Sequence, residues 1–430
     1  MNEPALSASR HHAALAFIFV TVTLDMLAFG IIIPVLPHLV LELTGGGLAH
    51  AAMWVGVIST LFMLMQFVFS PVQGALSDRY GRRAVILVSS FGLGVDFILM
   101  ALAPVMWLLL IGRAVSGICS ASFSTANAYI ADVVPHEKRA AAFGMLGAAF
   151  SIGFVLGPAL GGVLGHWHLR LPFWVAAALA LANFVYGWFV LPESLPKERR
   201  TPRVVWRDAN PLGAIVLLRR YPQVFGLAVV FFLINLAQFS LNSTYVLYAD
   251  YRFGWGPQAV GYALALLGVC AGIVQGGMVR RLMPRLGERR MIIAGLALCV
   301  AGYLLFGLAG SVTLFILAIP VFSLGGLAGP PAQSLMTHQV DPHEQGRLQG
   351  ALSSLRGLAG IVGPVLFADL FALSISKHAP VPHLPGAAFL LAALLCALAV
   401  WVALRAMRMR TADNGGSHKD SSPGSMEQTS

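Results

Sequence analysis

Long apolar stretches recur along the whole chain and are separated by short polar connections. A helix that crosses a bilayer needs about 20 mainly apolar residues, and each stretch is close to that length. The predicted spans are residues 13–36, 53–73, 85–102, 107–129, 140–164, 172–191, 224–247, 259–279, 291–310, 313–335, 348–367 and 387–404. The pattern therefore predicts an all-α integral membrane protein with twelve transmembrane helices.

Two polar segments interrupt this pattern. Residues 192–222 are basic and contain prolines, which is typical of a linker between domains. After Arg410 the chain is rich in Ser and Gly, which predicts disorder. We expect an N-terminal six-helix bundle at residues 1–191, a cytoplasmic linker at 192–222, a C-terminal six-helix bundle at 223–407 and a disordered cytoplasmic tail at 408–430.

A short internal repeat supports the division into two bundles. Pro-His-Glu at 135–137 is followed by Gly144 and Gly157-Pro158, and Pro-His-Glu at 342–344 is followed by Gly350 and Gly363-Pro364. Each copy precedes the fifth span of its half. Chance similarity between Gly-rich and Ala-rich helices is the alternative. Parallel six-helix repeats build one large class of transporters.

Composition agrees with a membrane protein. Charged residues make up 11% of the chain and hydrophobic residues 57%, whereas soluble domains are about 25% charged. A soluble protein of this length could not cover its surface with so few charges. The net charge of +10 does not indicate a nucleic-acid partner, because the basic residues form short clusters between apolar stretches.

The distribution of Lys and Arg predicts the orientation in the membrane. One set of alternate connections is arginine-rich, whereas the opposite side has only Arg170, Arg252 and Lys377. Basic loops stay in the cytoplasm, so we expect a multi-pass protein of the cell (inner) membrane with both termini cytoplasmic. The segment Met1–His12 is too polar for a cleavable signal, so the first span is expected to be retained.

Several functional classes find no support. The four cysteines lie far apart inside apolar stretches, so we expect packing residues and no metal site. Candidate catalytic groups do not cluster at one interface, so we expect no enzyme and no cofactor. The partners expected are a small-molecule substrate and the lipid bilayer, with the protein acting as a monomer.

Charged residues inside the predicted spans carry the strongest functional signal. They are Asp25, Asp96, Arg113 and Arg356, and their formal charges cancel. A charge at the bilayer centre is costly and is usually functional. Burial favours the neutral form of a carboxyl group, whereas a nearby arginine favours the anion. A carboxyl group balanced between these two effects can load and release a proton. We predict that Asp25 and Asp96 couple protons and that Arg113 tunes them; buried ion pairs that only join helices are the alternative.

Uncharged polar residues predict a substrate cavity. In the fourth span Arg113, Gly117, Ser120, Ser124 and Asn127 share one helical face. The remaining candidates are Gln66, Asn235, Gln238, Asn242, Tyr245, Gln275 and Arg356. These side chains suit a polar or amphipathic substrate. Helix packing for the serines and hydrogen bonds between helices for the amides are the alternatives.

Two glycine-containing segments predict conformational and packing roles. The loop Gly74–Arg83 combines glycines that permit a tight turn with Asp78, Arg79, Gly81 and Arg82. Its charges can pair with a helix end or with Asp132. In the fifth span Gly153, Gly157, Pro158 and Gly161 allow close helix contact and a kink.

These motifs resemble the major facilitator superfamily, and the fifth-span motif resembles its drug antiporters. The chain is similar along nearly its whole length to the tetracycline/proton antiporter group. The similar segments include residues 21–25, 34–37, 128–132, 252–255, 287–288 and 345–350. The resemblance implies that Asp25, Asp96 and Arg113 take part in transport. It also implies that Asp78 and Arg82 belong to a conformational switch with Asp132 as partner.

The second half departs from that group. Cys299 stands where the tetracycline exporters carry an Asp, Ala271 stands where they carry a His, and Arg356 is not expected there. The sequence therefore predicts a proton-coupled exporter of amphipathic drugs, with tetracycline-like compounds among the candidates. A proton- or sodium-coupled symporter of a small nutrient is the alternative.

Overall fold

The computed structural model describes residues 3–120, 122–134, 138–201, 221–341, 344–376 and 383–416. Side chains are described within these ranges except at 3–15, 122–124, 140–141, 199, 222–223 and 407–416. The Pro-His-Glu motif at 135–137, most of its counterpart, linker residues 202–220 and tail residues 417–430 lie outside them. Within the described ranges the secondary structure is helical.

The first half of the chain forms a bundle of long helices with short connections. Two of the breaks have simple causes: Pro34 precedes the second helix, and Gly81, at φ 102°, separates two long helices. The elements are α1 (Glu3–Ile32), α2 (Leu36–Thr44), α3 (Gly47–Tyr80), α4 (Arg82–Leu102), α5 (Met106–Cys119), α6 (Ser122–Val133), α7 (Arg139–Trp167) and α8 (Leu171–Val190).

The second half forms a similar bundle after the short 3₁₀ turn η2 (Lys197–Arg199). Here the helices are interrupted by a π-helical turn and a second 3₁₀ turn. The elements are α10 (Pro222–Phe253), α11 (Pro257–Ile273), η4 (Val274–Met278), α12 (Val279–Leu308), α13 (Val312–Leu324), η5 (Gly325–Ala328), α14 (Gly329–Thr337), α15 (Gln345–Ile375) and α16 (Ala387–Gly416).

These helices account for twelve crossings. In the described chain, ten segments are long and apolar enough to span a membrane. One of them, 257–308, turns back at Gly287 (φ 74°, ψ 162°) and so includes two crossings. The one crossing still to be assigned, the fourth along the chain, combines α5, a short apolar helix, with α6. The predicted all-α architecture of twelve transmembrane helices is therefore confirmed.

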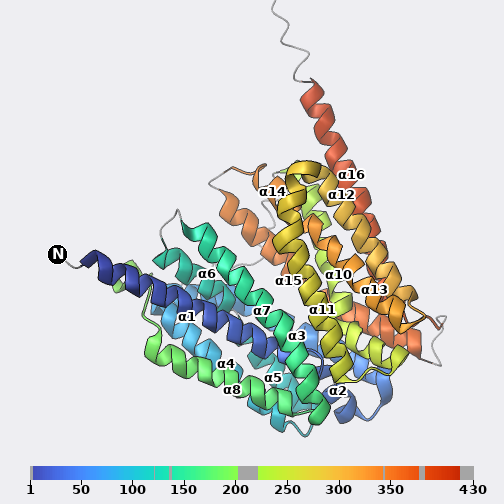
Figure 1. Ribbon diagram of the computed structural model, residues 1–430, viewed down its shortest axis with the longest axis horizontal. Helices are drawn as coiled ribbons and strands as arrows, with labels where there is room; N and C mark the ends of the chain where they lie inside the picture. The colour runs from blue at the N-terminus through green and yellow to red at the C-terminus, as the bar shows by residue number, and fades with distance from the viewer. Residues whose placement is uncertain are drawn as a thin grey trace, which may run out of the picture.

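The two bundles meet at one end and diverge at the other (Figure 1). We call the end with residues 45–46, 168–170 and 254–256 the arginine-poor end, and the end with Arg79–Arg83 and Arg280–Arg290 the arginine-rich end. Close contacts join Gly56 of α3 to Ala368 of α15, and Gly162 of α7 to Gly261 of α11. These glycines lie in the parts of their helices near the arginine-poor end.

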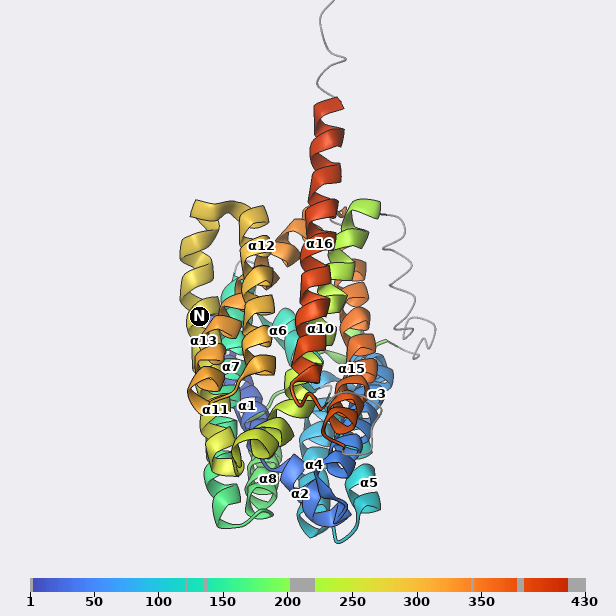
Figure 2. The ribbon, with the colours of Figure 1, turned by 90° about the vertical axis from the view of Figure 1, so that its right-hand side faces the viewer.

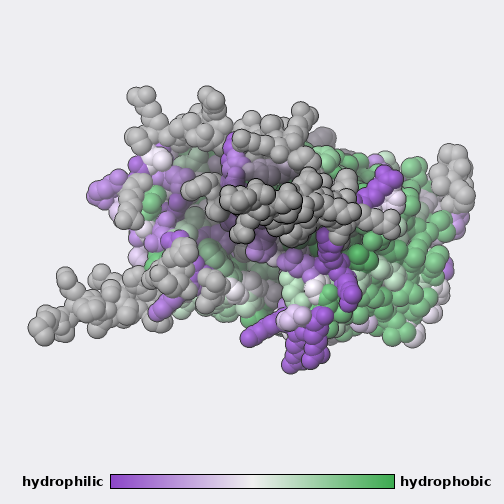
Figure 3. Space-filling model, turned by 90° about the horizontal axis from the view of Figure 1, so that it is seen from above, coloured by the Kyte–Doolittle hydropathy of each residue, from purple (hydrophilic) through white to green (hydrophobic). Residues whose placement is uncertain are grey.

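The hydrophobic core follows the same division. One cluster at the arginine-poor end includes residues of both halves, from Val35 and Phe97 to Phe306 and Phe389. Towards the arginine-rich end each half has a separate core, one around Tyr129 and one containing Val224, Met336 and Leu348. Figure 2 shows the turn that precedes the long part of α12 at the top of the molecule and α2 near the bottom. Seen from above, hydrophilic side chains gather beside a flank covered by hydrophobic side chains (Figure 3).

Several predicted spans differ from the structure, among them the fourth, the tenth and the eleventh. The fourth span, predicted as one helix over 107–129, ends at Cys119 and resumes at Ser122. The Ser120 hydroxyl donates to the carbonyl of Gly117 at 3.0 Å, and this local bond competes with continued helix. The tenth span is likewise divided at the 3₁₀ turn η5, which begins with two glycines. The eleventh span runs to Ile375, eight residues beyond the predicted end.

Candidate functional site

A buried charged cluster lies between α4 and α5. Asp96 of α4 is fully buried and Arg113 of α5 is 5% exposed. The Ser116 hydroxyl donates to Asp96 Oδ2 at 2.5 Å, and Arg113 Nη2 lies 3.6 Å from the same oxygen. Gly112 leaves room for the carboxylate, because a Cβ there would lie 2.6 Å from Asp96 Oδ1. Two of the residues predicted to couple protons are therefore direct partners.

The cluster also touches α3. The Arg113 guanidinium lies over the ring of Phe62, with 5.4 Å from Cζ to the ring centroid. The next residue, Met63, packs against Gly360 of α15 in the other half: a Cβ at Gly360 would lie 3.1 Å from the Met63 sulfur. Helix α3 thus separates the charged cluster on one side from the contact between the bundles on the other.

Asp25 belongs to a different contact within the first half. It is 8% exposed, and Asn183 of α8 donates to its Oδ1 at 3.1 Å. Asn183 is itself 2% exposed. Asn183 was not among the predicted site residues, although an amide inside the apolar sixth span was the available signal.

The end of α3 and the start of α4 hold a compact charged network. The predicted loop Gly74–Arg83 is wrong in extent, because α3 continues to Tyr80, α4 begins at Arg82, and Gly81 alone separates them. Arg82 Nη1 lies 2.6 Å from Asp78 Oδ1, and its Nε lies 3.1 Å from Asp132 Oδ2 on α6. The same guanidinium donates to the Ser77 hydroxyl at 2.5 Å. Arg79 instead is exposed and lies over the ring of Tyr80. Of the predicted switch residues, Asp78, Arg82 and Asp132 are thus in contact.

The start of the linker completes this network. Glu193 Oε1 accepts from the backbone N–H of Arg82 at 2.9 Å, and Glu193 Oε2 lies 3.5 Å from Arg200 Nη2. The backbone N–H of Thr201 donates to the carbonyl of Asp78 at 3.1 Å. Glu193 was not among the predicted site residues, because its acidic side chain was counted only as part of a basic linker.

Substitution of Gly81 by alanine is expected to lower the free energy of unfolding by about 1–2 kcal/mol. The backbone has φ 102° there, and an added Cβ would lie 2.0 Å from Glu193 Oε2. Gly74→Ala is the matched control, because that helical position is open and alanine favours a helix. Melting curves of the purified variants in detergent measure the difference. A lower melting temperature for Gly74→Ala than for Gly81→Ala would contradict this account.

The glycine motif of α7 packs against α1. A Cβ at Gly153 would lie 2.6 Å from Met26, one at Gly157 would lie 2.6 Å from Gly30, and one at Gly161 would lie 1.9 Å from the Ile31 carbonyl. The carbonyl of Pro158 faces the other half, 2.4 Å from a Cβ at Gly261. This segment of α7 therefore contacts both its own bundle and the opposite one.

The predicted cavity residues fall into three groups. Asn235, Gln238 and Asn242 share one face of α10, and exposure along it ranges from partial at Asn235 and Gln238 to high at Asn242. Gln66 is partly buried on α3 and Gln275 is exposed in the π-helical turn η4. Gly117 packs against the Phe62 carbonyl and Met65, and Asn127 is partly buried on α6. The side chain of Ser124 lies outside those that the structure describes.

Two expectations about the cavity need correction. The polar stripe from Arg113 to Asn127 does not lie on one continuous helix, because α5 ends at Cys119. Tyr245 does not face an open space: it is 1% exposed and stacks on Phe315 with ring centroids 5.1 Å apart. The periodicity that grouped Tyr245 with Asn242 could not show that aromatic residues of two other helices surround it.

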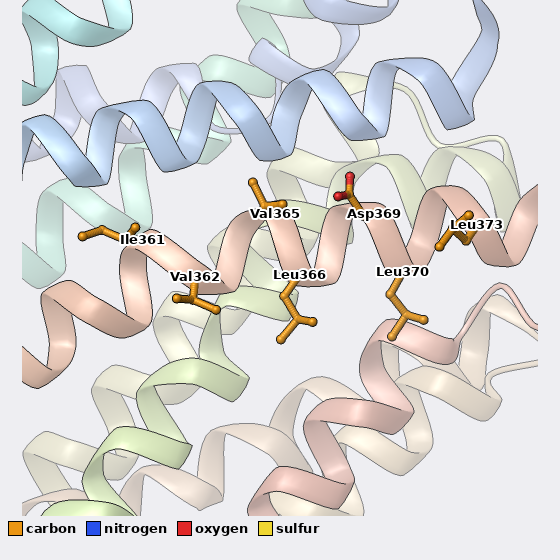
Figure 4. Close-up of a pocket in the computed structure, with 7 residues that line it drawn as sticks. All are labelled: Ile361, Val362, Val365, Leu366, Asp369, Leu370 and Leu373. Atoms are coloured by element: carbon orange, nitrogen blue, oxygen red, sulfur yellow. The ribbon is translucent and has the colours of Figure 1, made fainter.

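Two further positions with ionisable side chains were missed. Asp369 lies in a shallow groove on α15 whose other lining residues are apolar, and its side chain points towards α3 (Figure 4). The predicted span ended at Phe367 and so excluded it. His38 of α2 lies 4.0 Å from Asp250 of α10, which joins the halves at the arginine-poor end. A pairing between residues so far apart in sequence had no local signal.

Comparison with known proteins agrees with this architecture. The profile of the Major Facilitator Superfamily matches residues 18–364. The chain belongs to the Major Facilitator Superfamily. It is 38% identical to the tetracycline resistance protein, class C, of Escherichia coli over 89% of this chain and 95% of that protein. It is 31% identical to the tetracycline resistance protein, class H, of Pasteurella multocida over 90% of this chain and 94% of that protein.

A solved structure of this superfamily has the same fold. The human organic anion transporter MFSD10 (TETRAN) superposes with a TM-score of 0.69 at 25% identity, covering 91% of this chain and 99% of that one. The predicted family and the predicted similarity to tetracycline resistance proteins are therefore confirmed. The chain is a multi-pass membrane transporter.

Proposed function

We propose that this transporter is a proton-coupled exporter of amphipathic drugs. The observation that carries the proposal is the Asp96–Arg113–Ser116 cluster, which is buried next to the helix that contacts the other half. A carboxylate that shares its environment with one arginine changes the local charge balance when it takes up a proton. A shift of the Arg113 guanidinium would act on Phe62 and α3, and α3 contacts α15.

The names of the relatives support export of a drug. The class C and class H proteins are tetracycline resistance proteins, and removal of a drug from the cell is one route to resistance. MFSD10 is named an organic anion transporter, so acidic amphipathic compounds belong among the substrates to be tested. Alternating access would rock the two bundles about a central site.

Tetracycline itself requires a separate test because of the departures in the second half. Cys299 is 8% exposed, and its sulfur lies 3.7 Å from that of Cys396. Ala271 is partly buried on α11 and has no group that ligates a metal. A metal-chelated substrate favours oxygen and nitrogen ligands. We therefore expect this chain to protect a pump-deficient host better against other amphipathic drugs than against tetracycline.

The proposal includes an orientation in the membrane. With the arginine-rich end in the cytoplasm, the described conformation is closed towards the outside and opens inwards. Both termini are then cytoplasmic, the protein resides in the inner membrane of the cell, and one chain is sufficient for transport. The proton is the coupling ion, and no other cofactor is required.

Asp25→Asn is expected to abolish drug-dependent proton flux, because asparagine cannot carry a proton through the cycle. Everted vesicles with an acidic interior measure this flux as drug-induced loss of the pH gradient. The drug is one to which the wild-type chain confers resistance in the host. Asp369→Asn is the matched control, since that carboxylate lies in the α15 groove away from both first-half acids.

Wild-type flux in Asp25→Asn would contradict a coupling role for this residue. The direction of drug movement tests the other part of the proposal. Accumulation of the drug in everted vesicles under a proton gradient supports export. Drug uptake into intact cells, driven by protons or sodium, would instead favour the symporter.

A further inference from the structure

We propose that Arg356, held in place by Asn235 and Phe231, binds an anionic group of the substrate. This inference rests on the proposed transport of an amphipathic compound and specifies its chemical class. It assigns to Arg356 direct contact with the cargo, in contrast to Arg113, whose charge is used within the protein.

Arg356 lies where the contact between the bundles ends. On α15 it shares a face with Gly360 and Gly363, which follow at i+4 and i+7. Gly360 packs against Met63 of the first half, and both glycines pack against Phe239 of α10. One turn nearer the arginine-rich end, Arg356 is exposed. Its side chain therefore lies at the inner limit of the opening between the two diverging bundles.

One turn of α10 holds the guanidinium in a fixed orientation. Arg356 Nε donates to Asn235 Oδ1 at 3.2 Å. Asn235 Nδ2 in turn donates to the carbonyl of Phe231 at 2.8 Å, and the Phe231 ring lies 5.6 Å from Arg356 Cζ. This arrangement occupies Nε and leaves the two Nη groups without an acceptor among the described residues. The pair of Nη groups matches the spacing of two carboxylate oxygens.

The protein supplies no carboxylate for this charge within the described residues. No acidic side chain there lies within 4.0 Å of Arg356. Glu344 and Asp369 are 12 and 13 residues away along the chain, which corresponds to roughly 18–20 Å on a helix. A positive charge at this depth is costly unless water or an anion accompanies it. An anionic substrate would supply the missing counter-charge.

The surroundings define the rest of the ligand. Three aromatic residues lie next to this face of α15: Phe231 and Phe239 of α10 and Phe67 of α3. Phe67 packs directly against Gly357. An apolar ring system beside an acidic group would satisfy both the aromatic side chains and the guanidinium. The class of ligand is therefore an amphipathic organic anion or a zwitterion that presents its anionic group to Arg356.

A matched pair of probes tests this inference. We would compare 1-naphthylacetate with its uncharged amide, 1-naphthylacetamide, by thermal stabilisation of the purified full-length protein over a concentration series. The wild-type protein should bind the carboxylate at least about tenfold more tightly, the size of one charge-assisted hydrogen bond. Arg356→Gln should reduce the ratio to about one, whereas Arg356→Lys should retain part of the preference.

Arg252→Gln is the control variant, because Arg252 contacts the Ala309 carbonyl at the arginine-poor end and should leave the ratio unchanged. The inference is overturned if the wild-type protein shows no preference, if the carboxylate gives no stabilisation, or if Arg356→Gln keeps the wild-type ratio. The assay needs no proton gradient. Failure of proton coupling would therefore leave the ligand preference intact, and the two proposals can fail separately.

Discussion

Asp96→Asn is expected to reduce proton-coupled transport to the level of vesicles without the protein. Asparagine keeps the size of the side chain, but it neither accepts a proton nor balances Arg113, which lies 3.6 Å away and is almost fully buried. Removing one partner of a buried ion pair leaves the other charge uncompensated, which costs about 3–5 kcal/mol. We therefore expect lower stability together with the loss of transport.

A double variant separates these two effects. Asp96→Asn with Arg113→Gln removes both charges, so most of the lost stability should return, because neutral groups of similar size replace the pair. Transport should remain absent, because no proton site is restored. Melting curves and drug-dependent proton flux of the three variants measure the two quantities. Full flux in the double variant would show that the pair only holds α4 and α5 together.

Gly161→Val is expected to prevent correct packing of the first bundle. A Cβ at this position would lie 1.9 Å from the Ile31 carbonyl, and the backbone of α1 cannot move away without breaking other contacts. The result should be little folded protein in the membrane, or a free energy of unfolding lowered by about 3 kcal/mol, the upper end of the usual cost of overpacking. Yield after purification and the melting temperature measure this effect.

Gly162→Val provides a matched comparison at the next residue. A Cβ there would lie 2.6 Å from the Pro257 carbonyl and 2.9 Å from Gly261, both in the other half. This variant should fold, because each bundle remains intact, but the halves should no longer close at the arginine-poor end. A membrane-impermeant maleimide should then label His38→Cys faster, on the order of tenfold if the closed state is disfavoured by about 1.4 kcal/mol. Equal loss of folding in both variants would contradict the distinction between the two interfaces.

Much of the architecture could be predicted because it depends on local signals. A stretch of about 20 apolar residues specifies a crossing without regard to its neighbours. Asp25, Asp96 and Arg113 were recognised because any charge within such a stretch is conspicuous. Asp369 shows the limit of this reasoning: it lies two residues beyond the predicted end of the eleventh span, although α15 continues to Ile375.

The partners of these residues depended on the tertiary structure. Asn183 reaches Asp25 from a helix 158 positions later in the chain, and Glu193 reaches the backbone of Arg82 across 111 positions. Sequence spacing does not determine which faces of separate helices meet. The packing of Tyr245 against Phe315 is a second example, because its helical position alone indicated an open cavity.

The twelve crossings, the superfamily and the charged residues inside the membrane could therefore be predicted, because hydropathy and motifs are properties of contiguous residues. Three findings required the folded structure: the bundles meet at the arginine-poor end, Arg113 pairs with Asp96, and Arg356 has Asn235 and Phe231 as neighbours. These findings depend on helix packing, because small residues such as Gly162 and Gly261 determine how closely helices approach. That approach determines which polar groups find a partner inside the protein and which remain available to a ligand.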